Sequence, residues 1–331
     1  MRKKLIIIVP ASLFLFLVLI VYNKIRISAY ISSAEINHTI HAAADSLEKN
    51  YIFQDLGKVM SDSLRHGLTI GLFDKRNPRE FGKKVNEYLR KISGDKHFSF
   101  FFEPNVARDL KIPERKNFND HFLETEKENN FYIFPIKFLE DNIGYFRIDE
   151  LVDPTHAGDK IEMALDSLSH AKAIIIDLRN NNGGEPEMVQ RIISHFYSKD
   201  TSIHLNDIYF RNTNKTIEYW TLPNLKGNYM PQMPLYILTG KHTASGAEEL
   251  AYDLINLHRA TIIGEPTAGG AHPGDLLPVG DRFVMFMPEG NAVNPYSKSN
   301  WEKTGVVPDI YVKEDKALDK AIEIIKSKAS N

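Results

Sequence analysis

The sequence predicts an α/β protein with a mostly parallel sheet, preceded by a small helical subdomain. Two observations predict this fold class. From residue 142 onward, short apolar runs alternate with amphipathic segments, which is typical of parallel strands joined by helices. Before residue 93, apolar residues instead recur at helical spacing. The 331 residues are 43% hydrophobic, enough material for about two globular units.

The helical segment comes first along the chain. Its apolar residues recur near every third or fourth position, at Ile36, Ile40, Leu47 and Tyr51 and again at Phe81, Val85, Tyr88, Leu89 and Ile92. This spacing buries one face of a helix. We therefore divide the chain into an N-terminal segment (1–31), a helical subdomain (32–110) and an α/β core (111–331).

The α/β core is expected to contain four strands and four helices. The expected strands are 143–148, 173–178, 235–239 and 260–263, and the expected helices are 157–170, 186–196, 246–257 and 316–328. Residues 209–226 interrupt this rhythm and suggest an irregular or hairpin excursion.

The N-terminal segment has the pattern of a membrane anchor. Arg2, Lys3 and Lys4 precede an apolar run that extends from Leu5 to Tyr22. Its length is closer to the roughly 20 residues of a spanning helix than to a signal-peptide core, and no convincing cleavage site follows. The basic tip should remain inside, so we expect a transmembrane helix with the rest of the chain outside the cytoplasm.

Composition excludes several classes of function. The net charge of -2 gives no reason to expect a nucleic-acid partner. The chain has no cysteine, which excludes disulfides, thiolate metal sites and a cysteine nucleophile.

Ser245 is the first candidate for chemistry, because it lies where an expected strand gives way to an expected helix. A hydroxyl at a helix start lies beside unpaired N–H groups, which can hold a developing oxyanion. The same position also fits a capping box, since Ser245 and Glu248 spell S-x-x-E. The local sequence fits both interpretations.

A glycine loop and several histidines could complete a site. Gly183 and Gly184 follow the strand at 173–178, and their backbone can approach a ligand closely or simply form a tight turn. Of the 12 histidines, we compare three: His97 near the end of the helical subdomain, His242 just before Ser245, and His272, which we expect on a flexible Gly/Pro loop.

Six segments, taken in order, resemble the tail-specific or C-terminal processing serine peptidases. They are the D-x-H triplet at 95–97, IGYFRI at 143–148, DLRNNNGG at 177–184, LTGKHTASGAEELAYDL at 238–254, RATIIGEPTAGG at 259–270 and NPYSKSNWEKTGVVPDIYV at 294–312. Together they span about residues 34–313. The processing branch uses a lysine near the GG segment as base, and residues 265–272 contain none.

The match is better to the branch that resembles the tricorn protease core and interphotoreceptor retinoid-binding protein. That resemblance implies Ser245 as nucleophile, His97 as base and Glu302 as the carboxylate supporting it, with Gly246 and Gly183 or Gly184 forming the oxyanion hole. The tricorn type has a serine immediately before its histidine, where this chain has Lys96.

The resemblance further implies a crotonase-like core. We expect no PDZ module, because the stretch between Phe100 and Asn142 is too short to hold one. The proposed chemistry needs no metal, and we expect no cofactor. The substrate would be a peptide or a partly unfolded protein. The alternative is a non-catalytic protein that binds apolar ligands or peptides, because the same fold carries that function in the retinoid-binding relative.

Overall fold

The computed structural model describes residues 30–112 and 118–329. Its main helices are α2 (Ser33–Asn50), α3 (Gln54–Thr69), α4 (Pro78–Ser93), α5 (Pro104–Asp109), α6 (Phe118–Glu128), α7 (Pro154–Ser167), α8 (Pro186–Ser194), α9 (Gly246–Asn256) and α10 (Ala317–Ala329). Its strands are β1 (Ser99–Phe102), β2 (Lys137–Leu139), β3 (Ile143–Arg147), β4 (Ala173–Asp177), β5 (His204–Phe210), β6 (Lys215–Trp220), β7 (Leu235–Thr239), β8 (Thr261–Gly264), β9 (Gly274–Val279), β10 (Phe283–Pro288), β11 (Gly290–Val293) and β12 (Ile310–Tyr311).

The expected membrane helix falls on residues 1–29, which lie outside the described part of the chain. Within the ranges that are described, every helix is too short or too polar to cross a bilayer.

Six strands form the central sheet, in the order β12-β8-β7-β4-β3-β2. All neighbouring pairs run parallel except β2 with β3. Strands β4 and β7 are buried along their whole length, as expected when helices cover both faces of a parallel sheet. The predicted α/β class with a mostly parallel sheet is confirmed.

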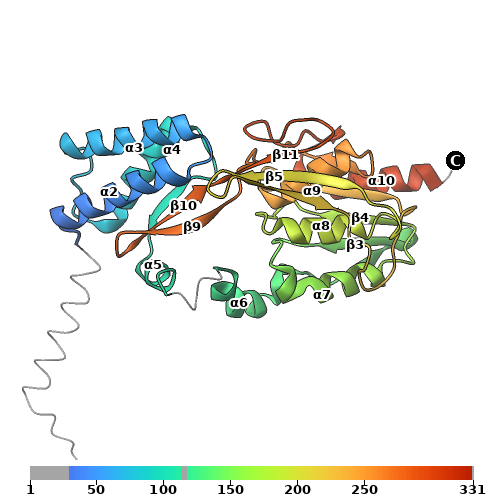
Figure 1. Cartoon of the computed structure of the whole chain (residues 1–331). Coiled ribbons are helices and arrows are strands. Elements are labelled where there is room, and N and C mark those ends of the chain that lie inside the picture. Colours follow the sequence, from blue (N-terminus) through green and yellow to red (C-terminus); the bar gives the residue numbers. More distant parts are fainter. Residues whose placement is uncertain (1–29, 113–117, 330–331) are drawn as a thin grey trace, which may run out of the picture.

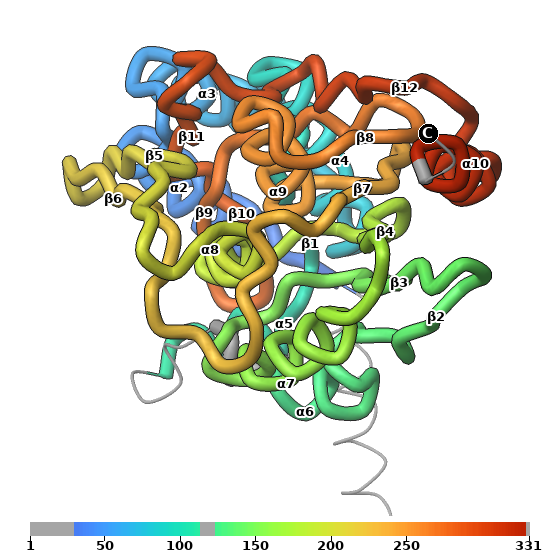
Figure 2. Tube along the Cα trace, turned by 90° about the vertical axis from the view of Figure 1, so that its right-hand side faces the viewer, coloured from blue at the N-terminus to red at the C-terminus, as the bar shows by residue number. Residues whose placement is uncertain are grey.

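Helices cover the two faces of this sheet unequally. Ile174 and Ile176 of β4 belong to a large apolar core shared with α7, α8 and α9. Ile175, which points to the opposite face, packs in a smaller core with Ala321 of α10. Figure 2 shows α10 on one side of the strands and α8 and α9 on the other.

The helical subdomain contains strands that come from far along the chain. Helices α2, α3 and α4 pack against a sheet of order β1-β10-β9. Phe81 of α4 contacts Phe283 of β10 edge to face, with ring centroids 5.1 Å apart. Figure 1 shows these three helices at one end of the molecule with β9 and β10 beside them. The downstream chain therefore enters the helical unit before returning to the core.

The predicted excursion at 209–226 is a hairpin. Strands β5 and β6 pair antiparallel, and β11 adds to the other edge of β5. Because β11 follows β10 directly, this third sheet joins the helical unit to the core.

Candidate active site

Ser245 lies at the turn between β7 and α9. Its backbone has φ 52° and ψ -124°, a conformation that glycine adopts freely and that strains other residues. The N–H groups of Glu248 and Glu249 donate to the backbone carbonyl of Ser245, at 2.8 and 3.0 Å. The Glu248 carboxylate also accepts from the Ser245 N–H, as in a capping box, so Ser245 begins α9 in either interpretation. A strained serine at a strand-to-helix turn is a known arrangement for a nucleophile.

The glycine loop after β4 lies directly against this serine. Gly183 has φ +105°, and a Cβ at this position would lie 2.6 Å from Cβ of Ser245. The N–H of Ala244 donates to the carbonyl of Asn181 at 3.0 Å, which joins the two loops. Only glycine fits at position 183 without moving Ser245.

Two backbone N–H groups beside Ser245 have no acceptor among the described residues. Gly183 donates to Oδ1 of Asn181 at 2.8 Å, so its N–H is already used. Gly184 and Gly246 donate to no atom in the part of the chain that the structure describes. Their backbones are close, because a Cβ on Gly246 would lie 3.2 Å from the nitrogen of Gly184.

Glu248 organises the surroundings of Ser245. Its buried carboxylate accepts from the N–H of Ser245 (2.9 Å), the N–H of Gly269 (2.6 Å), the N–H of Gly270 (2.9 Å) and the hydroxyl of Thr267 (2.5 Å). Burial raises the pKa of Glu248, and the four hydrogen bonds oppose this without cancelling it. The capping carboxylate expected from the sequence thus also ties α9 to residues 267–270.

His97 precedes β1, and its ring packs against Gly270, which belongs to the segment 267–270. A Cβ at Gly270 would lie 2.7 Å from Nδ1 of His97, so the ring rests against the backbone there. The Nδ1 atom is buried and has no hydrogen-bond partner among the described residues. Burial lowers the pKa of His97 to about 4, although the nearby charge of Asp95 opposes the shift. His97 is therefore neutral near pH 7, as a general base must be.

Glu302, which follows β11 along the chain, contacts the neighbouring residue Ala271. Its Oε2 accepts from the N–H of Ala271 at 2.8 Å, and the neighbouring Trp301 indole donates to the carbonyl of Gly270 at 2.5 Å. Its Oε1 is buried and, within the described ranges, unpaired. No hydrogen bond joins Glu302 to His97. Both residues nevertheless pack on the backbone of residues 270–271.

Sequence reasoning missed a buried network behind His97. Oδ2 of Asp95 accepts from the hydroxyl of Tyr51 at 3.0 Å and lies 3.0 Å from Nδ1 of His272. His272 is 5% exposed, so the expectation of a flexible position is wrong. Burial raises the pKa of Asp95, but the hydrogen bond and charge of His272 and the backbone N–H of His97 outweigh it and lower the pKa overall.

One sequence signal pointed to this network. Asp95 stands two residues before His97, a spacing at which Asp side chains often accept a hydrogen bond from a backbone N–H. Its Oδ1 accepts from the N–H of His97 at 2.9 Å. Ligand atoms of Asp95, His272 and Glu302 lie within 4.8 Å of one another, a donor set that suits a divalent ion. The same atoms also have protein partners, so their arrangement is explained by hydrogen bonds.

Lys96 occupies the place where the tricorn type has a serine. Its ammonium group donates to the carbonyl of Ala268, across the junction between the helical unit and the core. Lys96 therefore binds the two loops together at this position.

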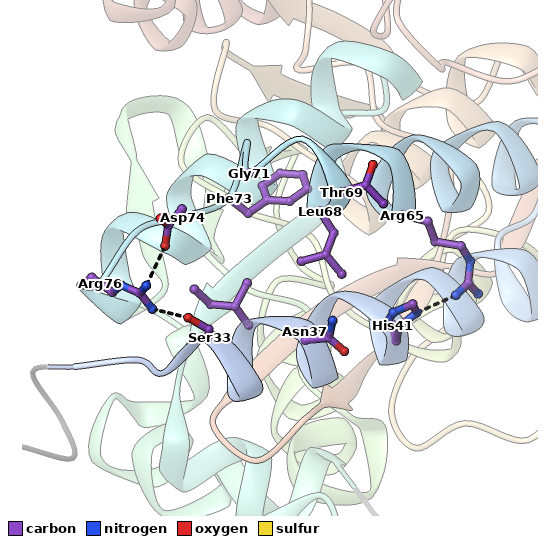
Figure 3. A pocket seen from close by; sticks show the side chains of 11 residues that line it. Ser33, Asn37, His41, Arg65, Leu68, Thr69, Gly71, Phe73, Asp74 and Arg76 are labelled. Carbon is purple, nitrogen blue, oxygen red and sulfur yellow. Dashed lines mark hydrogen bonds and ion pairs between the residues drawn. The ribbon is translucent and has the colours of Figure 1, made fainter.

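A cavity of about 480 Å³ lies elsewhere, between α2 and α3. Figure 3 shows its lining, in which Arg65 pairs with His41 and Arg76 with Ser33 and Asp74. Its basic side chains are already paired, and none of the candidate residues lines it. We place no catalytic function there.

On an α/β core, a strained serine beside glycine-loop N–H groups is typical of hydrolases with a serine nucleophile. The chain belongs to Peptidase family S41, which matches residues 142–312. The family resemblance read from the sequence is confirmed.

Two curated proteins with similar sequences are carboxy-terminal processing proteases. The chain is 27% identical over 239 residues to the carboxy-terminal processing protease CtpB of Bacillus subtilis, covering 70% of this chain and 46% of that protein. It is 28% identical over 177 residues to a carboxyl-terminal-processing protease of Synechocystis, covering 52% and 38%. The chain thus spans less than half the length of either relative.

Solved structures share the fold. A lipoprotein from Streptococcus agalactiae superposes with a TM-score of 0.60 at 18% identity, covering 90% of this chain and 97% of that one. The photosystem II D1 C-terminal processing protease gives 0.55 at 15% identity, covering 86% and 94%. The tricorn protease gives 0.55 at 12% identity, covering 90% and 37%. At these identities the likeness concerns the fold alone.

We expect Gly183→Ala to lower kcat/KM by about 100-fold, because a displacement of about 1 Å in an active site can cost that much. The added methyl would force Ser245, Ala244 or Gly246 to move. Steady-state kinetics on a peptide substrate measures this loss. Gly71→Ala is the matched control, since Gly71 also has a positive φ (+71°) but open space around it. It should strain the backbone and leave kcat/KM near wild type, and equal losses in both variants would contradict the steric argument.

Proposed function

We propose that this chain is a serine peptidase that hydrolyses peptide bonds through an acyl-enzyme on Ser245. The observation that carries the proposal is the contact between the Ser245 turn and the glycine loop. There the N–H groups of Gly184 and Gly246 lack acceptors within residues 30–112 and 118–329. Free N–H groups beside a strained serine are suited to an oxyanion. We therefore assign the loop donor to Gly184, because the N–H of Gly183 is occupied.

In the proposed reaction, His97 takes the hydroxyl proton while Oγ of Ser245 bonds to the substrate carbonyl carbon. The C–N bond then breaks, and His97 returns that proton to the leaving amine. In the second half, water attacks the acyl-enzyme, loses a proton to His97 and frees Ser245 when that proton returns to Oγ. Each step balances with the side chains and water alone.

Glu302 is proposed to support His97. Nδ1 of His97 and Oε1 of Glu302 are both buried and unpaired in the described chain. Buried polar atoms without partners are costly. A hydrogen bond between them would satisfy both atoms and stabilise the imidazolium that forms when His97 takes a proton.

Activity should persist at low pH if His97 is the base. With its pKa lowered to about 4, His97 stays neutral at about pH 5.5, where an ordinary histidine is mostly protonated. We expect kcat/KM to fall only as the pH drops toward 4. The unfolded chain takes up this proton at about pH 6.5, so stability also declines as the pH falls from there toward 4. Circular dichroism at each pH separates a loss of activity from unfolding. If kcat/KM of the folded protein fell with a midpoint near pH 6.5, His97 would not be the base.

The proposed substrates are peptides or partly unfolded proteins. The names of the two curated relatives suggest processing near carboxyl termini. We further propose that the chain is tethered to a membrane with its catalytic part outside the cytoplasm, on the strength of the basic and apolar residues at 2–22. Retention in the membrane pellet after alkaline washing tests the tether, and release into the supernatant would argue against it.

A fluorophosphonate probe tests the function directly. It should label the wild-type protein and not Ser245→Ala, because the probe reacts with activated serines. Absence of labelling and of peptide hydrolysis in folded wild-type protein would favour the non-catalytic binding alternative.

A further inference from the structure

We infer that His272 is a positioning residue that holds the His97 loop of the helical unit beside the Glu302 carboxylate of the core. The inference rests on the proposed function, because it concerns the base of that reaction. It concerns a histidine outside the proposed set of Ser245, His97 and Glu302.

The chain of contacts runs through Asp95. One carboxylate oxygen, Oδ1, accepts from the backbone N–H of His97 at 2.9 Å. The other, Oδ2, accepts from Nδ1 of His272 at 3.0 Å and from the hydroxyl of Tyr51. The same Nδ1 lies 3.6 Å from Oε2 of Glu302. His272 thus contacts both the residue that orients His97 and the carboxylate proposed to support it.

These contacts cross the junction between the two structural units. Tyr51 follows α2 and Asp95 follows α4, both in the helical unit. His272 lies in the segment that leads into β9, and Glu302 lies in the segment that follows β11. A hydrogen bond at this point fixes the distance between loops that the chain connects only over a long path.

His272 acts through its neighbours and not on substrate. Its side chain is 6% exposed and that of Asp95 is 2% exposed. The ring of Phe53 packs edge to face on His272 with centroids 5.1 Å apart, which limits rotation of the imidazole. A donor at the Nδ1 position is therefore the property that matters.

Three substitutions test this requirement. Asparagine places an N–H donor near the position of Nδ1, glutamine places it farther out near Nε2, and alanine removes it. We expect His272→Ala and His272→Gln to lower kcat by about 10- to 100-fold, with KM within about twofold of wild type, because a displaced base slows chemistry more than binding. His272→Asn should recover kcat to within about threefold of wild type.

His195→Asn is the matched control. His195 is also buried and bonds through Nδ1 to the carbonyl of Asn228 at 3.1 Å. It ends α8, at the opposite end of that helix from the glycine loop. The His195→Asn variant should have a lower melting temperature than the wild-type protein and an unchanged kcat. A second test combines His272→Ala with Asp95→Asn, and the double variant should be no slower than the slower single variant if His272 acts through Asp95.

The inference is overturned if His272→Ala keeps wild-type kcat, or if His272→Asn is no faster than His272→Gln. Should the alanine variant fail to fold, the comparison of Asn with Gln still decides. Failure of the proposed function is distinguishable, because the wild-type protein itself would then resist the fluorophosphonate probe. Failure of this inference alone leaves wild-type labelling intact.

Discussion

Ser245→Ala should lower kcat/KM by about 1,000-fold or more while leaving the fold intact. The substitution removes only the oxygen that we propose as the nucleophile, and alanine keeps the Cβ that packs on Gly183. Hydrolysis of a fluorogenic peptide measures the loss, and thermal unfolding measures the fold. Full activity in this variant would refute the mechanism.

His97→Ala should produce a similar loss, and the double variant should be little worse than either single one, because the two residues act as a unit. His242→Ala is the control. His242 is exposed and stands three positions before Ser245, so it tests whether any nearby histidine can be the base. A large loss for His242 with none for His97 would reassign the base.

Glu248→Ala should destabilise the protein by about 3 kcal/mol or more, since several buried donors lose their acceptor at once and each typically costs about 1–3 kcal/mol. The N–H groups of Ser245, Gly269 and Gly270 and the Thr267 hydroxyl all depend on this carboxylate. Activity should fall with it, because the same bonds place the Ser245 turn against the segment that covers His97. Urea unfolding and peptide kinetics measure the two effects.

Two further variants sharpen the Glu248 experiment. Glu248→Gln keeps the shape and one acceptor oxygen, so its losses should be smaller. Glu87→Ala removes an exposed carboxylate of α4 that pairs with Lys83 at 3.8 Å, and it should change stability by less than about 0.5 kcal/mol. If Glu248→Ala were no worse than Glu87→Ala, the organising role of Glu248 would be wrong.

Much of the core could be predicted because its signals are local. The apolar run at 173–176 is short and rich in β-branched residues, which favours an inner strand, and the structure places β4 there with every residue buried. Ser245 was expected at a helix start, and α9 begins at the next residue. The hairpin at β5 and β6 was anticipated only as an interruption.

The candidate site could be predicted only in part. Ser245, His97 and Glu302 were singled out by resemblance, since no single segment distinguishes a nucleophile from a cap or a base from any other histidine. The sequence left the loop donor open between Gly183 and Gly184. The hydrogen bond from Gly183 to Asn181 favours Gly184, and no periodicity contains that information.

Apolar spacing over a few neighbouring residues was enough to predict strands β3, β4, β7 and β8 and helices α7, α8, α9 and α10, whereas most of the other strands were not predicted from the sequence. The entry of β9 and β10 into the helical unit and the contact of His272 with Asp95 depend on how the folded chain packs. These contacts join segments that lie far apart along the chain, so local spacing holds no information about them. An apolar run such as 283–288 gains the same burial against many partners, and the partner is chosen by packing among segments more than 150 residues apart, as Phe81 and Phe283 are.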